Sequence, residues 1–458
     1  MTAPVDDTGS GFGQSLAIES GRLLVGHLRG DNGAGVSSGS VHVYDAGTGT
    51  RRGVLRPSDA ASTQEFGYSV AIDGDTAVVG ARGDNVFGND SGSAYVFDLD
   101  TSAELSKLAP PDGRGGDYFG WSVAIGGGAV IAGAAYDDDN GGRSGSAYLF
   151  DQPTVDQPDS DLRGKLVPLD NGSSDVFGVS MAIDGRLAVI GASGRTTPFE
   201  SGSAYVYDVV TGEELAELVP SDGDNNDDFG RWVALDDGRA LISSHSDDDD
   251  GRDAGAAYGF DVATGQQLAR LTPSDASDRD FFGWSLALDG ELAVIGAVGD
   301  DDNGSGSGSA YVFNITTGRQ LAKLDAWDRE FPDGERDQFG WSVAIEGNVV
   351  AIGARYGNGA DIGSGAVYLF DIQPRGDFNN DGVVDAADYT LWRDAQATGV
   401  FDASADANGD GAIDVMDYNV WFTTFGDAAP SSGATVPEPT AAALALSAAA
   451  ALARRRRG

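Results

Sequence analysis

A Phe-Gly pair followed by a short apolar run returns seven times along this chain of 458 residues, at intervals of about 52–58 residues. Such a regular interval is typical of repeat architectures, in which each unit buries its hydrophobic surface against its neighbours. The interval therefore restricts most of the chain to a ring or a stack of similar units. The seven pairs begin at Phe12, Phe66, Phe119, Phe177, Phe229, Phe282 and Phe339.

Each unit contains about four short strand segments, as the second copy illustrates. Its first apolar run ends at Asp73-Gly74, and an Asp-Gly pair between two apolar runs predicts a hairpin with a type I′ turn. The segments 77–79 and 94–97 are apolar on both faces, which indicates a sheet that is covered on both sides. Three copies close with a Leu-Ala-x-Leu strand, at 215–218, 268–271 and 321–324.

Seven such sheets can bury both of their faces if they stack radially and close a ring. We therefore predict a mainly β fold, with a seven-bladed β-propeller over residues 1–372. An open solenoid of the same units is the structural alternative. A small α-helical calcium-loop domain over 377–427 and a short apolar C-terminal helix are predicted to follow the propeller.

The Phe-Gly, Gly-Ala and Tyr-Val-Phe elements resemble the FG-GAP (integrin α N-terminal-like) repeat of the integrin α-subunit propeller and its bacterial relatives. The proline that ends the Gly-Ala-Pro element in that family is replaced here, for example by Arg82 and Arg355. In that family some blades carry a calcium loop between their first two strands. Here Asp73-Gly74 or its equivalent makes that connection, which is too short to surround an ion, so we expect that the calcium sites of that family do not carry over to these blades.

The two ends of the repeat region complement each other. The seventh copy stops after 367–371 without a fourth strand, and Met1 occupies the place of the last Leu in a Leu-Ala-x-Leu strand. Our hypothesis is that the gene product begins upstream of Met1, with a signal peptide and the missing strand.

The net charge of −43 makes nucleic acid an unsuitable partner and leaves divalent cations, cationic surfaces or neutral glycans. Three acidic loops, 137–140, 247–250 and 300–303, follow the second strand of their units and should lie on one face. Their oxygen donors suit calcium, but they lack the fixed alternation of a calcium loop, and plain solvation is the alternative interpretation. The chain has no Cys, so disulfides and thiolate chemistry are excluded.

Three tryptophans each follow a Phe-Gly pair, where they either pack between blades or stack on sugar rings: Trp121, Trp284 and Trp341. Arg-Gly-Asp triplets occur at 29–31, 82–84 and 375–377, and coincidence explains them in a chain rich in Gly and Asp. The repeats contain neither a metalloprotease helix motif nor a nucleophile elbow, and only three histidines. We therefore predict a non-catalytic propeller without catalytic or cofactor-binding residues.

Two twelve-residue segments, 377–388 and 406–417, have the ligand spacing of a calcium loop. Oxygen donors stand at positions 1, 3, 5, 9 and 12, Gly stands at position 6, and position 7 offers its backbone carbonyl. We predict one calcium ion in each loop. The predicted ligands are Asp377, Asn379, Asp381, Val383, Asp385 and Asp388 in the first loop, and Asp406, Asn408, Asp410, Ala412, Asp414 and Asp417 in the second.

Each calcium loop leads into a helical Asp-Tyr-x-x-Trp segment, and its Tyr and Trp share one helix face. Asp at position 12 makes the pair of loops resemble a type I dockerin domain over 377–427. That resemblance implies a protein partner, namely a cohesin-like module. Ala386-Ala387 and Val415-Met416 replace the Ser/Thr recognition pairs of cellulosomal dockerins, so another surface protein is the alternative partner.

The C-terminal tail follows a linker of small residues at 428–435. Val436-Pro437-Glu438-Pro439, an apolar run over 441–453 and an arginine cluster at 454–457 resemble a PEP-CTERM sorting signal. This resemblance implies an exosortase-type processing enzyme, transient membrane contact through residues 436–458, and a Gram-negative-type bacterium.

Together these features indicate an exported bacterial protein of the cell surface or extracellular matrix. Its propeller is predicted to bind a protein or glycan ligand, and its dockerin-like module to dock. The alternative is a polysaccharide-active enzyme, a glycoside hydrolase or lyase, with a carboxylate pair in the central cleft of the propeller.

Overall fold

The computed structural model describes residues 1–372, apart from 3–8, 31–36, 159, 171, 195–200, 225, 327–336 and 358–362, and also residues 384–398, 418 and 421. The chain divides into two units, residues 1–371 and residues 372–458. Among the described residues, no helix combines the length and the apolar character that crossing a lipid bilayer requires.

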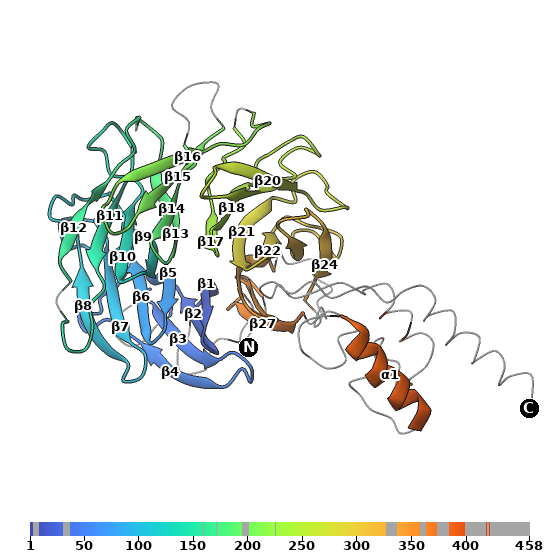
Figure 1. Cartoon of the computed structure of the whole chain (residues 1–458). Coiled ribbons are helices and arrows are strands. Elements are labelled where there is room, and N and C mark those ends of the chain that lie inside the picture. The colour runs from blue at the N-terminus through green and yellow to red at the C-terminus, as the bar shows by residue number, and fades with distance from the viewer. Residues whose placement is uncertain are drawn as a thin grey trace, which may run out of the picture. The chain divides into compact units, whose positions relative to one another are not determined.

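The first unit is a ring of seven antiparallel sheets, so the predicted seven-bladed β-propeller is confirmed (Figure 1). Six sheets have four strands in sequence order, and the seventh has the three strands β25-β26-β27. The first strand of each blade contacts the first strands of both neighbouring blades, and β1 contacts β25. This last contact closes the ring and rules out the open solenoid.

The strands of the first four blades are β1 (Phe12–Glu19), β2 (Arg22–His27), β3 (Ser40–Asp45), β4 (Arg51–Leu55), β5 (Phe66–Asp73), β6 (Thr76–Ala81), β7 (Ser93–Asp98), β8 (Ala103–Leu108), β9 (Phe119–Gly126), β10 (Ala129–Ala134), β11 (Ser146–Asp151), β12 (Leu162–Leu166), β13 (Phe177–Asp184), β14 (Leu187–Ala192), β15 (Ser203–Asp208) and β16 (Glu214–Leu218). The strands of the last three blades are β17 (Val233–Asp236), β18 (Arg239–Ser244), β19 (Ala256–Asp261), β20 (Gln266–Leu271), β21 (Phe282–Asp289), β22 (Leu292–Ala297), β23 (Ser309–Asn314), β24 (Gln320–Leu324), β25 (Phe339–Glu346), β26 (Val349–Ala354) and β27 (Ala366–Asp371).

The hairpins between the first and second strands form where the Asp-Gly pairs predict them, but the predicted turn type is wrong in the second blade. Asp73 pairs with Thr76 as the last residue of its strand, so the two central turn residues are Gly74 and Asp75. Gly74 has a φ of 56°, and Asp75 is not among the residues with positive φ. A type I′ turn needs positive φ at both central residues, whereas glycine at the first central position is typical of type II′.

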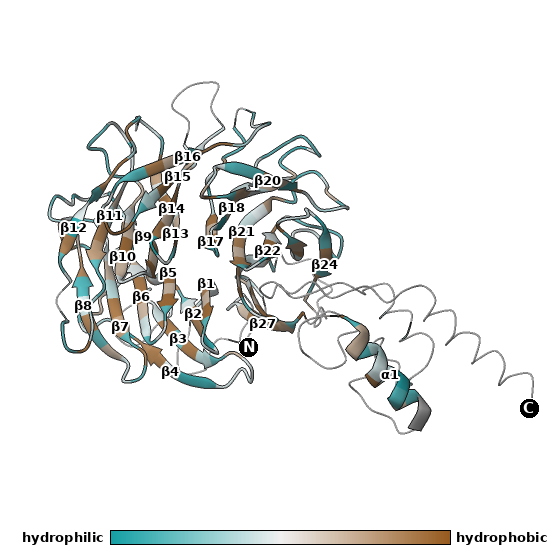
Figure 2. Cartoon of the chain, in the orientation of Figure 1, coloured by the Kyte–Doolittle hydropathy of each residue, from teal (hydrophilic) through white to brown (hydrophobic). Residues whose placement is uncertain are grey.

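The core lies between the blades, which explains the apolar character of both sheet faces. Phe66 is fully buried and lies edge-on to Tyr95 and Phe97 of its own blade, with ring centroids 5.5 and 5.8 Å away. The same cluster contains Leu24 and Val43 of the first blade. Hydrophobic residues accordingly line the sheets, and hydrophilic residues gather in the loops (Figure 2).

A glycine at the start of each third strand allows neighbouring blades to approach closely. Gly92 has a φ of 83°, and a Cβ atom there would lie 1.9 Å from the carbonyl oxygen of Phe119 in the next blade. The Phe119 amide in turn donates a hydrogen bond of 2.9 Å to the Ser91 carbonyl. The recurrent Gly of the Gly-Ser-Ala-Tyr element is therefore required by contact between blades.

The start of the chain lies beside the outer strand of the seventh blade. Thr2 forms an antiparallel bridge with Ala366, and the Val367 amide donates a hydrogen bond of 2.8 Å to the Met1 carbonyl. In the second blade the equivalent position opposite Ala94 is taken by Leu108. Met1 thus takes the place of the last Leu of a fourth strand, as the repeat alignment predicts.

Candidate functional site

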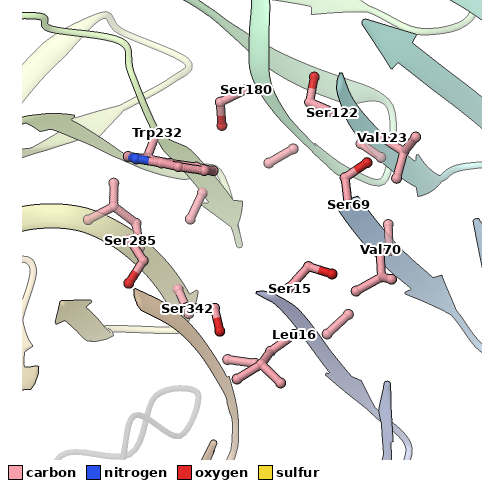
Figure 3. Close-up of a pocket in the computed structure, with 18 of the residues that line it drawn as sticks. Ser15, Leu16, Ser69, Val70, Ser122, Val123, Ser180, Trp232, Ser285 and Ser342 are labelled. Carbon is pink, nitrogen blue, oxygen red and sulfur yellow. The ribbon is translucent and has the colours of Figure 1, made fainter. Parts of the chain in front are cut away.

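A cavity of about 350 Å³ lies between the first strands of the blades. Five of the serines around it each donate a hydrogen bond to the carbonyl of the glycine in the Phe-Gly pair of the next blade. Ser342 donates one of 2.7 Å to the Gly13 carbonyl and so joins the last blade to the first. These hydroxyls therefore hold the ring together. The serines that line the cavity are Ser15, Ser69, Ser122, Ser180, Ser285 and Ser342 (Figure 3).

Four aromatic side chains line this cavity, and Trp284 packs against one of them, Trp341. We call these five residues the aromatic mouth: Tyr68, Trp121, Trp232, Trp284 and Trp341. The ring centroids of Tyr68 and Trp121 lie 5.3 Å apart, and those of Trp284 and Trp341 lie 5.1 Å apart. Each pair joins neighbouring blades, so packing between blades is observed. All five side chains remain partly exposed, and stacking on a sugar stays a prediction.

Two arginines that replace the family proline stack on the aromatic mouth. The Arg82 guanidinium lies 3.7 Å from the Tyr68 ring centroid and 2.7 Å from the Glu65 carboxylate. The Arg355 guanidinium lies 4.4 Å from the Trp341 ring centroid. Burial lowers the pKa of Arg355, and the nearby charges of Arg82 and another arginine lower it further. Positive charge is thus concentrated at this mouth.

The opposite opening is surrounded by carboxylates and leads into a second cavity of about 510 Å³. Glu19 accepts a hydrogen bond of 3.0 Å from the Gly74 amide, and Asp236 accepts one of 2.6 Å from the Gly290 amide, each across a blade boundary. Burial raises the pKa of both carboxyl groups. The carboxylates at this opening are Glu19, Asp73, Asp184, Asp236, Asp289 and Glu346.

The three acidic loops are built around buried ion pairs. Asp137 begins the first loop, lies 2.7 Å from the Lys165 ammonium, and accepts hydrogen bonds from Ser146 at 2.8 Å and Tyr148 at 3.1 Å. The oxygens of residues 137–139 lie within 4.8 Å of one another, but they face this lysine and Arg114. Equivalent pairs are Asp84 with Lys107, Asp247 with Arg270, and Asp300 with Lys323.

The cations of these pairs were missed by the sequence reasoning, although a signal for them exists. Each stands directly before the last Leu of the fourth strand in a blade whose loop begins with a buried Asp. In the fourth blade, where no such loop occurs, that position is Glu217. The same arrangement buries the Asp84 carboxylate of the Arg82-Gly83-Asp84 triplet, so this triplet is not displayed as a ligand.

In the second unit, the described part of the first calcium loop adjoins helix α1 (Ala386–Thr398). The Asp385 carboxylate accepts a hydrogen bond of 2.6 Å from the Ala387 amide and so caps the helix. Asp388 is fully buried and accepts one of 2.7 Å from the Asp385 amide. A fully buried carboxylate suits a cation site, because a buried charge requires an opposite charge. The predicted ligands outside the described residues are Asp377, Asn379, Asp381, Val383, Asp406, Asn408, Asp410, Ala412, Asp414 and Asp417.

The two Tyr-Trp pairs form the predicted core of this unit. Trp392 and Trp421 pack together with Val384, and the indole nitrogen of Trp421 donates a hydrogen bond of 2.8 Å to the Asp385 carbonyl. Tyr389 and Tyr418 border the cluster, with the Tyr389 and Trp421 ring centroids 5.1 Å apart. The core thus fixes residue 385 of the calcium loop relative to both helical segments.

Comparison with known families agrees with this architecture. The family model for the FG-GAP repeat matches residues 50–97, 103–150, 161–207, 213–260, 266–313 and 319–370. Each match begins near the fourth strand of one blade and ends with the third strand of the next. The family model for the dockerin type I domain matches residues 375–420. A search of curated proteins gave no match.

Proposed function

Because the chain belongs to the FG-GAP repeat family and carries a dockerin type I domain, we propose that it is an exported protein with a non-catalytic, ligand-binding propeller. FG-GAP repeats and dockerin domains are typical of extracellular and surface proteins. The observation that carries the proposal is the chemistry of the axial cavity. Among the residues that line it, Tyr68 is the one with a titratable side chain, and five of the serine hydroxyls are engaged between blades.

The polysaccharide-active alternative would need a pair of carboxylates beside a glycosidic bond, one of them able to donate a proton. The carboxylates of the opposite opening are the place for such a pair, since burial raises the pKa of Glu19 and Asp236. Both carboxylates, however, accept backbone hydrogen bonds from the next blade. We assign them to the closure of the ring.

The dockerin domain is proposed to bind two calcium ions and a protein partner. Dockerin domains of this type bind calcium and cohesin-type partners, and the buried Asp388 beside Asp385 supports the first of the two ions. The second ion rests on the identical spacing of 406–417. A cohesin-like module or another surface protein is the proposed partner.

Sorting to the surface is proposed to depend on the tail. The order Pro-Glu-Pro, apolar run and arginine cluster over 436–458 supports processing by an exosortase-type enzyme after transient membrane contact. The proposed location of the mature protein is accordingly the surface or the matrix of a Gram-negative-type bacterium. Removal of 436–458 should change the location of the protein and leave the propeller folded.

The test is a glycan and surface-protein array probed with the full-length protein, followed by product analysis of every bound glycan. We expect calcium-dependent capture of a protein partner and binding of a ligand without turnover. Cleavage of a bound glycan that is lost in both Glu19→Gln and Asp236→Asn would overturn the non-catalytic assignment. Those variants retain the shape of the carboxylates, so they separate chemistry from ring closure.

A further inference from the structure

We infer that the aromatic mouth binds a sugar that bears a carboxylate, such as a uronic acid residue at the end of an acidic polysaccharide. The inference rests on the proposed ligand-binding function and names the class of ligand. Its basis is the combination of partly exposed indole rings that line the axial cavity, arginines beside those rings that form no ion pair with a described residue, and the buried oxygen of Gln14.

The first observation is positive charge that forms no ion pair with the described carboxylates. The guanidinium groups of Arg231 and Arg355 form no ion pair or hydrogen bond with any residue in the described part of the chain. The Arg231 group lies 5.8 Å from the Trp232 ring centroid, and the Arg355 group lies 4.4 Å from the Trp341 ring centroid. By contrast, Lys165 faces three carboxylates. In a protein of net charge −43, two arginines beside one cavity with no ion-pair partner among the described residues point to an anionic ligand.

The two arginines lie beside different rings of the same mouth, Arg231 beside Trp232 and Arg355 beside Trp341. Burial raises the pKa of Tyr68, while the charges of Arg82, Arg231 and Arg355, from three different blades, oppose that rise. Stacking on a ring orients a guanidinium plane, and an oriented guanidinium offers two parallel N–H donors to a carboxylate. The mouth therefore holds preorganised donors for a carboxylate that arrives along the axis.

The second observation separates a sugar from a simple carboxylate. Gln14 lines the cavity, and its buried Oε1 has no hydrogen-bond partner among the described residues. Buried polar atoms are normally paired, so this acceptor requires a donor from a ligand or water. A sugar hydroxyl can donate to this amide oxygen, which an ionised aspartate side chain cannot do.

The third observation is shape. The apolar C–H face of a pyranose ring packs on an indole through dispersion and loss of hydration, and Trp121, Trp232 and Trp341 all line the cavity. The cavity volume of about 350 Å³ lies at the small end of ligand pockets. This volume suits the end of a glycan better than an internal segment of a long chain.

The experiment titrates the full-length protein with trisaccharides of galacturonate, glucuronate and mannuronate, by calorimetry and tryptophan fluorescence. Methyl esters of the same trisaccharides are the neutral controls. We expect at least one acid to bind and its ester to bind at least about tenfold more weakly. Arg355→Ala should weaken binding about 10- to 100-fold, because it removes charge-assisted hydrogen bonds. Arg252→Ala, on the exposed rim and paired with Asp253, is the matched control and should change affinity less than about twofold.

Three results would overturn the inference. Equal binding of acid and ester would show that the carboxylate is not recognised. Binding of hexa-aspartate in place of the sugars, with the same dependence on Arg355, would assign the mouth to an acidic protein. Failure of all three acids, while another glycan or protein binds, would remove this ligand class and leave the proposed function standing. Absence of every ligand in the array would instead count against the proposed function.

Discussion

Replacing Lys165 by Met removes the cation at the centre of the first acidic loop and keeps most of the side-chain volume. The ammonium lies 2.7 Å from the carboxylates of Asp137 and Asp139 and 3.0 Å from that of Asp112. Without it, three carboxylates face one another. The side chain of Asp137 is 5% exposed, so water cannot replace the lost partner there.

The magnitude follows from burial. Removing one partner of a buried ion pair costs about 3–5 kcal/mol, whereas exposed pairs contribute about 0–1 kcal/mol. Asp112 and Asp139 are 40% and 32% exposed, so Asp137 dominates. Because Lys165 itself is 23% exposed, we expect the lower end of the range, a loss of about 3 kcal/mol in the free energy of unfolding at pH 7.

The effect should depend on pH. The hydrogen bond from Lys165 lowers the pKa of Asp139 below its ordinary value of 3.8. A carboxyl group whose pKa is lowered in the folded state contributes stability that is present above pH 3.8, its ordinary pKa, and that is lost as the pH falls through its pKa in the folded protein. The part of the stability difference between wild type and Lys165→Met that Asp139 contributes should therefore be present near neutral pH and shrink below about pH 4.

The assay is urea unfolding of the full-length protein followed by far-UV circular dichroism. A loss of about 3 kcal/mol lowers the urea midpoint by about 1 M for a slope of about 3 kcal/mol/M. In the Asp137→Asn background the same replacement should cost at least about 1 kcal/mol less, because the buried charge is gone. A loss below about 0.5 kcal/mol at pH 7, or an equal loss in both backgrounds, would refute the buried-pair argument.

Three further outcomes are expected. Burial raises the pKa of Asp227 from its ordinary value of 3.8 to about 7. The contribution of its protonated carboxyl group to stability is therefore fully present below pH 3.8 and is lost as the pH rises through about 7. Asp227→Asn should raise the urea midpoint at pH 8 and have little effect at pH 4. Gly92→Ala should lower the free energy of unfolding, measured by thermal melting, by at least about 3 kcal/mol, because its Cβ would lie 1.9 Å from a carbonyl oxygen. Gly74→Ala should lower it by only about 1 kcal/mol, because no atom lies within 4 Å of the added Cβ. Chelation of calcium should change the fluorescence of Trp392 and Trp421 and leave the strand signal of the propeller unchanged.

Much of the architecture was determined by the sequence, because its signals are local. The recurrence of Phe-Gly sets the number of blades, and apolar runs such as 77–79 identify strands that are buried on both faces. The twelve-residue spacing at 377–388 identifies a calcium loop, since its ligands come from one short segment. The turn type at Gly74 was the exception: one residue of register decides between types I′ and II′, and only strand pairing reveals that register.

The tertiary structure alone decided which distant side chains meet. Asp137 and Lys165 belong to a loop and a strand of one blade and pair only when the sheet forms, which turns an acidic loop into a buried ion pair. Arg82 and Arg355 follow the same Gly-Ala element in the second and seventh blades, and closure of the ring brings them to the same mouth, Arg82 beside Tyr68 and Arg355 beside Trp341. A repeat pattern predicts what each unit contains. Equivalent positions of different units meet around one axis only when the ring closes, because residues far apart in the sequence come together only in the folded chain.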